Sequence, residues 1–220
     1  MRPAKSLNGA AHAEEMLGEV RALATTVGLP GAPALVESAT TSLPTIQTET
    51  QWRRFLCQEF TTVLLSQEGP LIVQAHRLTC LGHVRELVAL DQTWGHARKL
   101  LPAYLPAMNA ASAHVGQAQL RRLLPLRDQR IVPRYLAAIA AGEAHGWHPL
   151  VYGLLLGVFA LPLRPGVLHY GRQTARGVLA GSPLAHALDE SAQNRLLDEA
   201  EQAVLTLLPQ LLPFVPPEIV

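Results

Sequence analysis

The chain has 220 residues, of which 49% are apolar and 16% charged, so it can bury a sizeable core and is not disordered over most of its length. Its 18 Lys and Arg against 17 Asp and Glu give a net charge of +1. This balance argues against a general nucleic-acid-binding protein, which would carry a basic face.

The first part of the chain predicts one helix followed by irregular connections. Residues 1–12 are small and polar, which predicts a flexible N-terminus. Apolar residues then recur at helical spacing over 12–27, and Gly28 and Pro30 end that helix.

Two further helices are predicted around a Gly-Pro step. Thr48 is expected to cap the first, with Gln51 as its capping-box partner. Gly69 and Pro70 are expected to end this helix, and Pro70 suits the first turn of the next.

The middle of the chain predicts three more helices. Asp91 is expected to cap one that runs through Leu100. A long helix rich in Ala, Gln and Leu is predicted over 102–124 and broken by Pro125, and a short one over 134–141.

The C-terminal third predicts two apolar helices and a final amphipathic one. The run 148–161 is apolar for almost four turns, and a second helix over 165–180 follows at once. Residues 181–183 interrupt the pattern, and a last helix is predicted over 189–208. Prolines then predict a proline-rich tail over 210–220.

No window alternates apolar and polar residues as a half-buried strand would. We therefore predict an all-α fold, a single-domain bundle of about eight to ten helices over 13–209.

The cysteines and the acidic residues near the N-terminus indicate in which cellular compartment the protein is found. Cys57 and Cys80 stand in apolar helical patterns, which favours buried thiols in a reducing setting. Glu14 and Glu15 fall where a signal peptide would need its apolar core, and the run 151–163 is too short to span a bilayer. We expect a cytoplasmic protein that contacts no membrane.

Glycines inside the predicted helices indicate close packing. Gly116 lies in mid-helix, at a cost of about 1 kcal/mol against Ala that close approach of a neighbouring helix would offset. Gly153 and Gly157, four residues apart, predict a second close contact. The predicted helix-packing residues are Ser112, Gly116, Gly153 and Gly157.

No motif for catalysis is present: the chain has no Gly-x-Ser-x-Gly, no P-loop and no Gly-x-Gly-x-x-Gly. His145 and His148 form the only close histidine pair, but Gly146 and Pro149 argue against one shared helix. A role in capping or packing is favoured over a metal site. We expect no catalytic residue and no metal ligand on this chain.

Three segments match the motifs of a known helical family. Residues 109–117, Asn-Ala-Ala-Ser-Ala-His-Val-Gly-Gln, are similar to its Arg-x-Ala-Ser-x-x-Met-Gly-Arg stretch, and 148–153 to its His-x-x-x-Tyr/Phe-Gly entry. His169-Tyr170 stands where the family carries a Tyr in a helix implicated in partner contact. Over residues 16–208 the chain resembles the UreF-type urease accessory proteins.

Two family signatures are altered. The opening Leu-Pro-x-Gly-Gly-Phe is reduced to Leu-Pro-Gly-Ala-Pro at 29–33. The late Arg-Leu-x-Pro-Leu-Gly-Gln is replaced, and Gln193 is expected to stand in for its Gln.

The resemblance implies a nickel-insertion scaffold, not an enzyme. Such a protein is often a homodimer, binds an accessory protein of the D or H type and recruits a nickel-carrying GTPase to apo-urease. This chain would then bind no cofactor, because the partner complex handles nickel and GTP. The partner-binding residues expected on this basis are His169, Tyr170, Arg172, Gln173, Arg176 and Gln193.

Other interpretations stay open from the sequence. Tyr170, Gln173 and Arg176 would form a polar stripe whose Arg can bond a partner carboxylate bidentately, but a solvated helix face is the alternative. The chain could instead be a ligand-binding protein or enzyme with a pocket between helices, or a diverged interaction module. The pocket would use His76, His114 or Tyr152.

Overall fold

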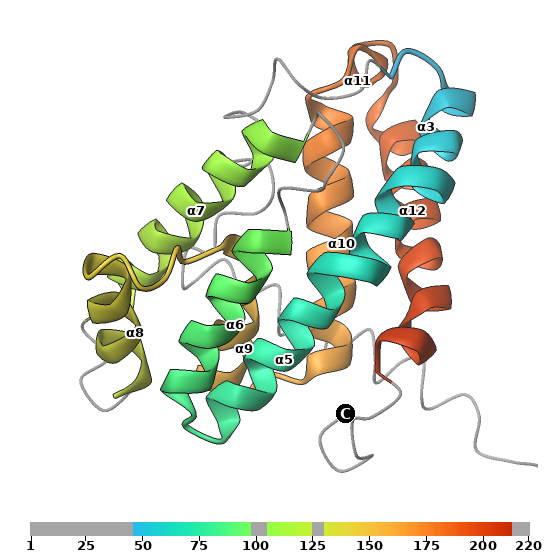
Figure 1. Ribbon diagram of the computed structural model, residues 1–220. Helices are drawn as coiled ribbons and strands as arrows, with labels where there is room; N and C mark the ends of the chain where they lie inside the picture. Colours follow the sequence, from blue (N-terminus) through green and yellow to red (C-terminus); the bar gives the residue numbers. More distant parts are fainter. Residues whose placement is uncertain (1–45, 98–104, 125–129, 213–220) are drawn as a thin grey trace, which may run out of the picture.

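The computed structural model describes residues 46–97, 105–124 and 130–212, and its regular structure there is helical, with no strand. The predicted all-α fold is confirmed. Helices α7 (Leu105–Arg122) and α8 (Ile131–Ala140) lie on one side of the molecule and α12 (Glu190–Leu211) on the other. Between them lie α5 (Gly69–Cys80), α9 (His148–Val158) and α10 (Leu163–Ala180) (Figure 1). The predicted helix over 12–27, the boundaries at Pro102 and Pro125, and the tail beyond residue 212 lie outside the described residues.

A long continuous helix opens the described fold. It consists of α3 (Glu49–Phe55), η1 (Leu56–Phe60), α4 (Thr61–Val63), η2 (Leu64–Glu68) and α5 (Gly69–Cys80) (Figure 1). The predicted capping box is confirmed: Gln51 N donates to Thr48 Oγ1 at 3.2 Å, and Thr48 N donates back to Gln51 Oε1 at 3.2 Å.

The predicted break at Gly69 and Pro70 is wrong, because the helix passes through both residues. Proline lacks an N–H and its ring crowds the carbonyl four residues earlier, which is Ser66 O. Ser66 lies in the π-helical turn η2, in which Gly69 N donates to Leu64 O five residues earlier, so the helix is wider directly before Pro70.

Asp91 does not cap a helix. It lies in the middle of α6 (Val84–Ala97), which follows a tight turn at Gly82 with φ of 71°. The apolar pattern of α6 therefore begins a full two turns before Asp91, and this carboxylate faces the protein interior.

The remaining helices agree with the predicted order and differ at their ends. The apolar helix over 148–161 stops at Val158, because Ala160 takes a left-handed φ of 52° and Leu161 N donates back to Leu156 O at 2.8 Å. Asp189 caps the last helix through Ala192 N at 2.7 Å, and that helix continues through Pro209. The helices are α7 (Leu105–Arg122), α8 (Ile131–Ala140), α9 (His148–Val158), α10 (Leu163–Ala180), α11 (Pro183–His186) and α12 (Glu190–Leu211).

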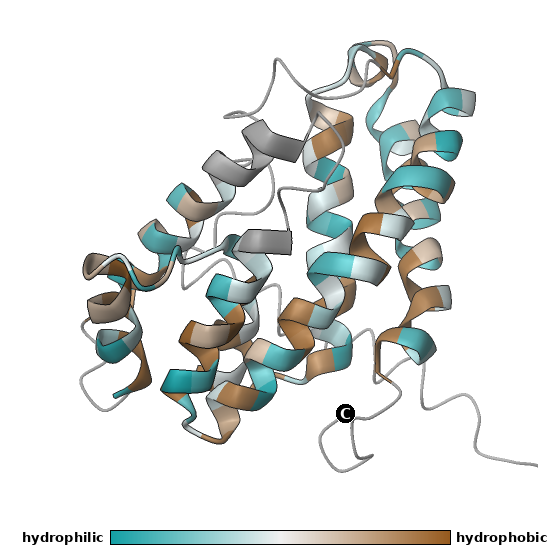
Figure 2. Ribbon diagram, in the orientation of Figure 1, coloured by the Kyte–Doolittle hydropathy of each residue, from teal (hydrophilic) through white to brown (hydrophobic). Residues whose placement is uncertain are grey.

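Helix α9 is the centre of the molecule. One cluster of buried apolar residues joins the long helix to α10 and α12, and another joins α5 to α6, α7 and α8. Tyr152 and Leu156 of α9 belong to the first cluster, and Leu150 and Leu154 to the second. A helix between two cores must be apolar on all sides, and His148 to Leu156 are all buried. In contrast, α5 and α12 each carry both hydrophobic and hydrophilic residues around their circumference (Figure 2).

Two glycines let α9 contact α5 at backbone distance. A Cβ on Gly153 would overlap the Ile72 carbonyl oxygen and lie 2.9 Å from Ala75 Cβ. A Cβ on Gly157 would lie 2.8 Å from Thr79 Cβ. No side chain larger than hydrogen fits at either position without moving α5.

The third glycine packs against the entry to α9. A Cβ on Gly116 of α7 would overlap the Gly146 carbonyl oxygen and lie 3.1 Å from His148 N. One turn earlier, Ser112 Oγ accepts a hydrogen bond from His148 N at 3.0 Å. Helix α7 therefore holds the first turn of α9 in place through small residues.

We expect Gly153→Ala to lower the free energy of unfolding by about 1–3 kcal/mol, because the new methyl group meets backbone that cannot give way. Chemical denaturation monitored by circular dichroism measures this loss. Gly95→Ala in α6 is the matched control, since its Cβ would meet His145 Cε1 at an ordinary 3.4 Å. The control should be neutral or stabilising by up to about 1 kcal/mol. Equal effects from both substitutions would contradict the close α5–α9 contact.

Candidate partner-binding surface

Tyr170 of the predicted contact helix α10 lies inside the protein. Its side chain is 3% exposed, and its hydroxyl donates to Glu68 Oε2 in the π-turn η2 at 3.0 Å. Its ring stacks on His148 with centroids 5.6 Å apart and tilts against Tyr152 at 5.0 Å. His169 is also buried. Tyr170 therefore joins three elements of the core.

The predicted polar stripe on α10 runs from the interior to the surface. Successive positions three residues apart on a helix drift by about 60° around its axis. Tyr170 is accordingly buried, Gln173 is half-buried and Arg176 is exposed. The expectation of one solvent-facing stripe is wrong for Tyr170, and of the three residues only Arg176 is exposed.

Arg172 joins α10 to α12. Its Nη1 lies 2.7 Å from Asp198 Oδ1 and 2.6 Å from Glu201 Oε2, and its side chain is 12% exposed. A guanidinium shared by two carboxylates is held in one orientation. Arg172 fixes the exposed edge of α10 against α12.

Gln193 bonds within the chain as well. Its Nε2 donates to Ala185 O at 3.0 Å and to Leu188 O at 3.2 Å. These carbonyls belong to α11 and the turn after it, so Gln193 holds α11 against the first turns of α12.

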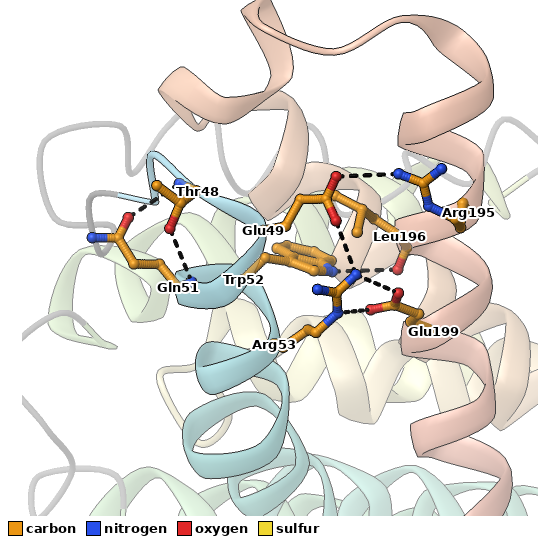
Figure 3. A network of polar contacts seen from close by, with 8 residues as sticks. All are labelled: Thr48, Glu49, Gln51, Trp52, Arg53, Arg195, Leu196 and Glu199. Carbon is orange, nitrogen blue, oxygen red and sulfur yellow. Dashed lines mark hydrogen bonds and ion pairs between the residues drawn. The ribbon is translucent and has the colours of Figure 1, made fainter.

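A second ion-pair network joins α3 to α12 (Figure 3). Arg53 bonds Glu49 and Glu199, each at 2.9 Å, and Arg195 bonds Glu49 at 3.1 Å. Beneath them, Trp52 Nε1 donates to a backbone carbonyl of α12 at 3.3 Å. The buried indole fixes the contact, since exposed ion pairs are individually weak.

Asp91 organises the segment that leads into α9. Fully buried, it accepts hydrogen bonds from Tyr135 Oη at 2.5 Å, His145 N at 2.7 Å and Gly146 N at 2.9 Å. Burial, with the Asp91 charge and hydrogen bond, raises the pKa of Tyr135 well above its usual value, so this phenol keeps its proton and donates.

Sequence reasoning missed this function of Asp91, although a signal was present. Asp91 falls between Leu87 and Trp94 at spacings of four and three residues, which places it on the buried face of α6. An acidic residue on an apolar face has to find hydrogen-bond donors elsewhere in the chain.

The histidine pair does not converge on a common point. His145 is exposed, with Nδ1 3.1 Å from Asp91 Oδ1 and its ring stacked on Trp147 at 4.9 Å. His148 is buried at the start of α9. Both pack as structural residues, and within the described ranges no three His, Cys, Asp or Glu side chains are grouped to hold a metal ion.

The prediction of buried thiols is wrong. Cys57 and Cys80 are both exposed, on the outer side of the long helix whose buried side carries Leu56 and Phe60. Cys80 Sγ lies 3.8 Å from Nε2 of His76, which is 5% exposed. Burial lowers the pKa of His76, and its hydrogen bond to the Leu161 backbone partly offsets that.

The residues named for an inter-helix pocket are not brought together. His76 lies at the end of α5, His114 is exposed on α7, and Tyr152 is buried with its hydroxyl on Gly166 O at 3.0 Å. A shallow surface hollow is found on the first turns of α12 instead. It is lined by Asp189, Glu190, Ser191, Asn194, Arg195 and Asp198.

A family model described as UreF matches residues 46–201, from the segment before α3 to the middle of α12. The chain belongs to the UreF family. UreF is a family of urease accessory proteins of the chaperone type, so the resemblance seen in the sequence motifs is confirmed. No curated protein and no solved structure matches the chain. Across its described ranges, this UreF-family chain has no helix with the length and apolarity needed to cross a bilayer.

We expect Tyr135→Phe to lower the free energy of unfolding by about 1.5–3 kcal/mol, because it removes a hydrogen bond to a buried carboxylate. Tyr152→Phe is the matched control: it removes a bond to a neutral carbonyl and should cost about 0.5–1.5 kcal/mol. Urea denaturation of both variants measures the difference. A Tyr135→Phe variant no less stable than Tyr152→Phe would contradict the organising role of Asp91.

Proposed function

We propose that this UreF-family chain is a scaffold for urease maturation. In this proposal it acts in the cytoplasm as a homodimer, binds an accessory protein of the D or H type, and recruits a nickel-carrying GTPase to apo-urease. The family match over residues 46–201 is the observation that carries the proposal. Nickel and GTP belong to the partner complex, and this chain contributes binding surface.

The exposed edge of α10 is the contact surface that we propose. Arg176 is exposed there and Gln173 is half-buried. A guanidinium can bond a partner carboxylate through two parallel hydrogen bonds, and arginine is enriched among the residues that dominate interface energies.

The other predicted contact residues support this edge from within. Tyr170 attaches α10 to Glu68 and His148, and Arg172 attaches it to α12. His169 is buried beside Tyr170 and Gln193 holds α11. We propose that these four residues act by positioning the surface, because each is buried or is already bonded within the chain.

Co-expression with the D/H-type protein and the GTPase, followed by affinity capture and size exclusion, tests the proposal. The wild-type chain should co-elute with its partners. Arg176→Ala should raise the dissociation constant at least about tenfold, as expected for an arginine that contributes 1.4 kcal/mol or more. Arg134→Ala on the exposed face of α8 is the matched control and should bind normally.

Two outcomes would count against the proposal. A folded wild-type chain that co-elutes with none of the candidate partners would contradict the scaffold function. If Arg176→Ala and Arg134→Ala weaken partner binding equally, the α10 edge is not the contact surface. Tyr170→Phe, which deletes only the bond to Glu68, separates the two roles: it should lower stability more than binding.

A further inference from the structure

The last turn of α5 brings an imidazole and a thiol together. His76 and Cys80 are four residues apart and so lie on one face of the helix. Nε2 of His76 is 3.8 Å from Sγ of Cys80. His76 is buried and Cys80 is an exposed residue, so the pair is reached from solvent on the cysteine side.

The orientation of the His76 imidazole is fixed by a contact on the side of the ring away from Cys80. Its ring is hydrogen-bonded to the backbone of Leu161, the residue at the corner between α9 and α10. We assign the ring proton to Nδ1, which donates to that carbonyl and leaves the Nε2 lone pair directed at Cys80. A backbone carbonyl that accepts from the far ring nitrogen is the usual second partner of a metal-binding histidine.

The end of the helix favours a cation, whereas partial burial raises the pKa of the Cys80 thiol. Helix α5 ends at Cys80, and the C-terminal end of a helix carries partial negative charge from its last carbonyl groups. The separation of the two atoms also fits. With Zn–S of about 2.3 Å and Zn–N of about 2.0–2.1 Å, tetrahedral coordination places nitrogen and sulfur about 3.6 Å apart.

We propose that His76 and Cys80 form a two-ligand site for a borderline-soft divalent cation of the zinc type. One nitrogen and one thiolate sulfur are ligands that such ions prefer. The remaining coordination positions face solvent and are filled by water or by a group from a bound partner. No rearrangement of the backbone is needed, because both ligands already lie at the required spacing.

This site is separate from the proposed partner surface. Leu161 precedes α10, and Arg176 lies roughly 20 Å further along that helix at 1.5 Å per residue. Evidence for or against this metal site therefore does not bear on the proposed scaffold function. The chain also supplies an internal comparison: Cys57 is exposed on the same long helix, but Arg53 and Thr61, and not histidines, stand four residues away on either side.

Cobalt titration of the full-length, reduced and metal-free chain tests the proposal. Co²⁺ bound to a thiolate gives a near-ultraviolet charge-transfer band, which should rise to saturation and be displaced by Zn²⁺. Cys80→Ser should abolish the band, and Cys57→Ser should leave it unchanged. His76→Gln should weaken cobalt binding at least about tenfold, since loss of even an outer partner costs a metal site that much.

Circular dichroism of each variant separates loss of binding from loss of fold. If His76→Gln unfolds the chain because His76 is buried, the variant Cys80→Ser at an exposed position still tests the proposal. A wild-type chain with no saturable thiolate band would overturn the proposal, and so would a band that survives Cys80→Ser or disappears with Cys57→Ser. The pair would then be an S–H···N contact that only packs the end of α5.

Discussion

The close approach of α5 and α9 is the constraint on which the rest of the structure depends. Gly153 and Gly157 contribute no side-chain atom to this contact, so the backbone of α9 packs directly on α5. That contact places an apolar helix between two clusters of buried residues, and each cluster is closed by a different set of outer helices. Without it, α9 would have to expose one of its apolar sides, at about 25 cal/mol for each Å².

From this central helix the structure controls the surface proposed for partner binding. His148 and Tyr152 of α9 hold Tyr170, which in turn fixes the buried side of α10. Arg172 fixes the other side against α12. The exposed residues of α10 are therefore presented by a helix that is held on two sides. A preorganised surface of this kind loses less conformational entropy on binding, which suits a scaffold that must bring several partners together.

Local signals in the sequence predicted the parts of the fold that depend on local chemistry. The cap at Thr48, the start of the last helix at Asp189 and the apolar run of α9 were predicted correctly, since each is set by neighbouring residues. What failed depends either on contacts between distant segments or on a π-turn that the sequence pattern does not indicate. Pro70 continues a helix because a π-turn precedes it, and Asp91 is buried because donors more than 40 residues away reach it. For the same reason, the sequence pattern on α10 could not show which end of its stripe is covered by η2 and α9.

Native-state hydrogen exchange, resolved by residue, tests the central position of α9 most directly. If the α5–α9 contact holds the two clusters together, the amides of α9 should be among the slowest to exchange, and their opening free energy should equal that of global unfolding. The amides of α8, at the edge of the molecule, should open at lower free energy. Amides of α9 that exchange faster than those of α8 would contradict the account, because α9 could then open while the outer helices stay folded.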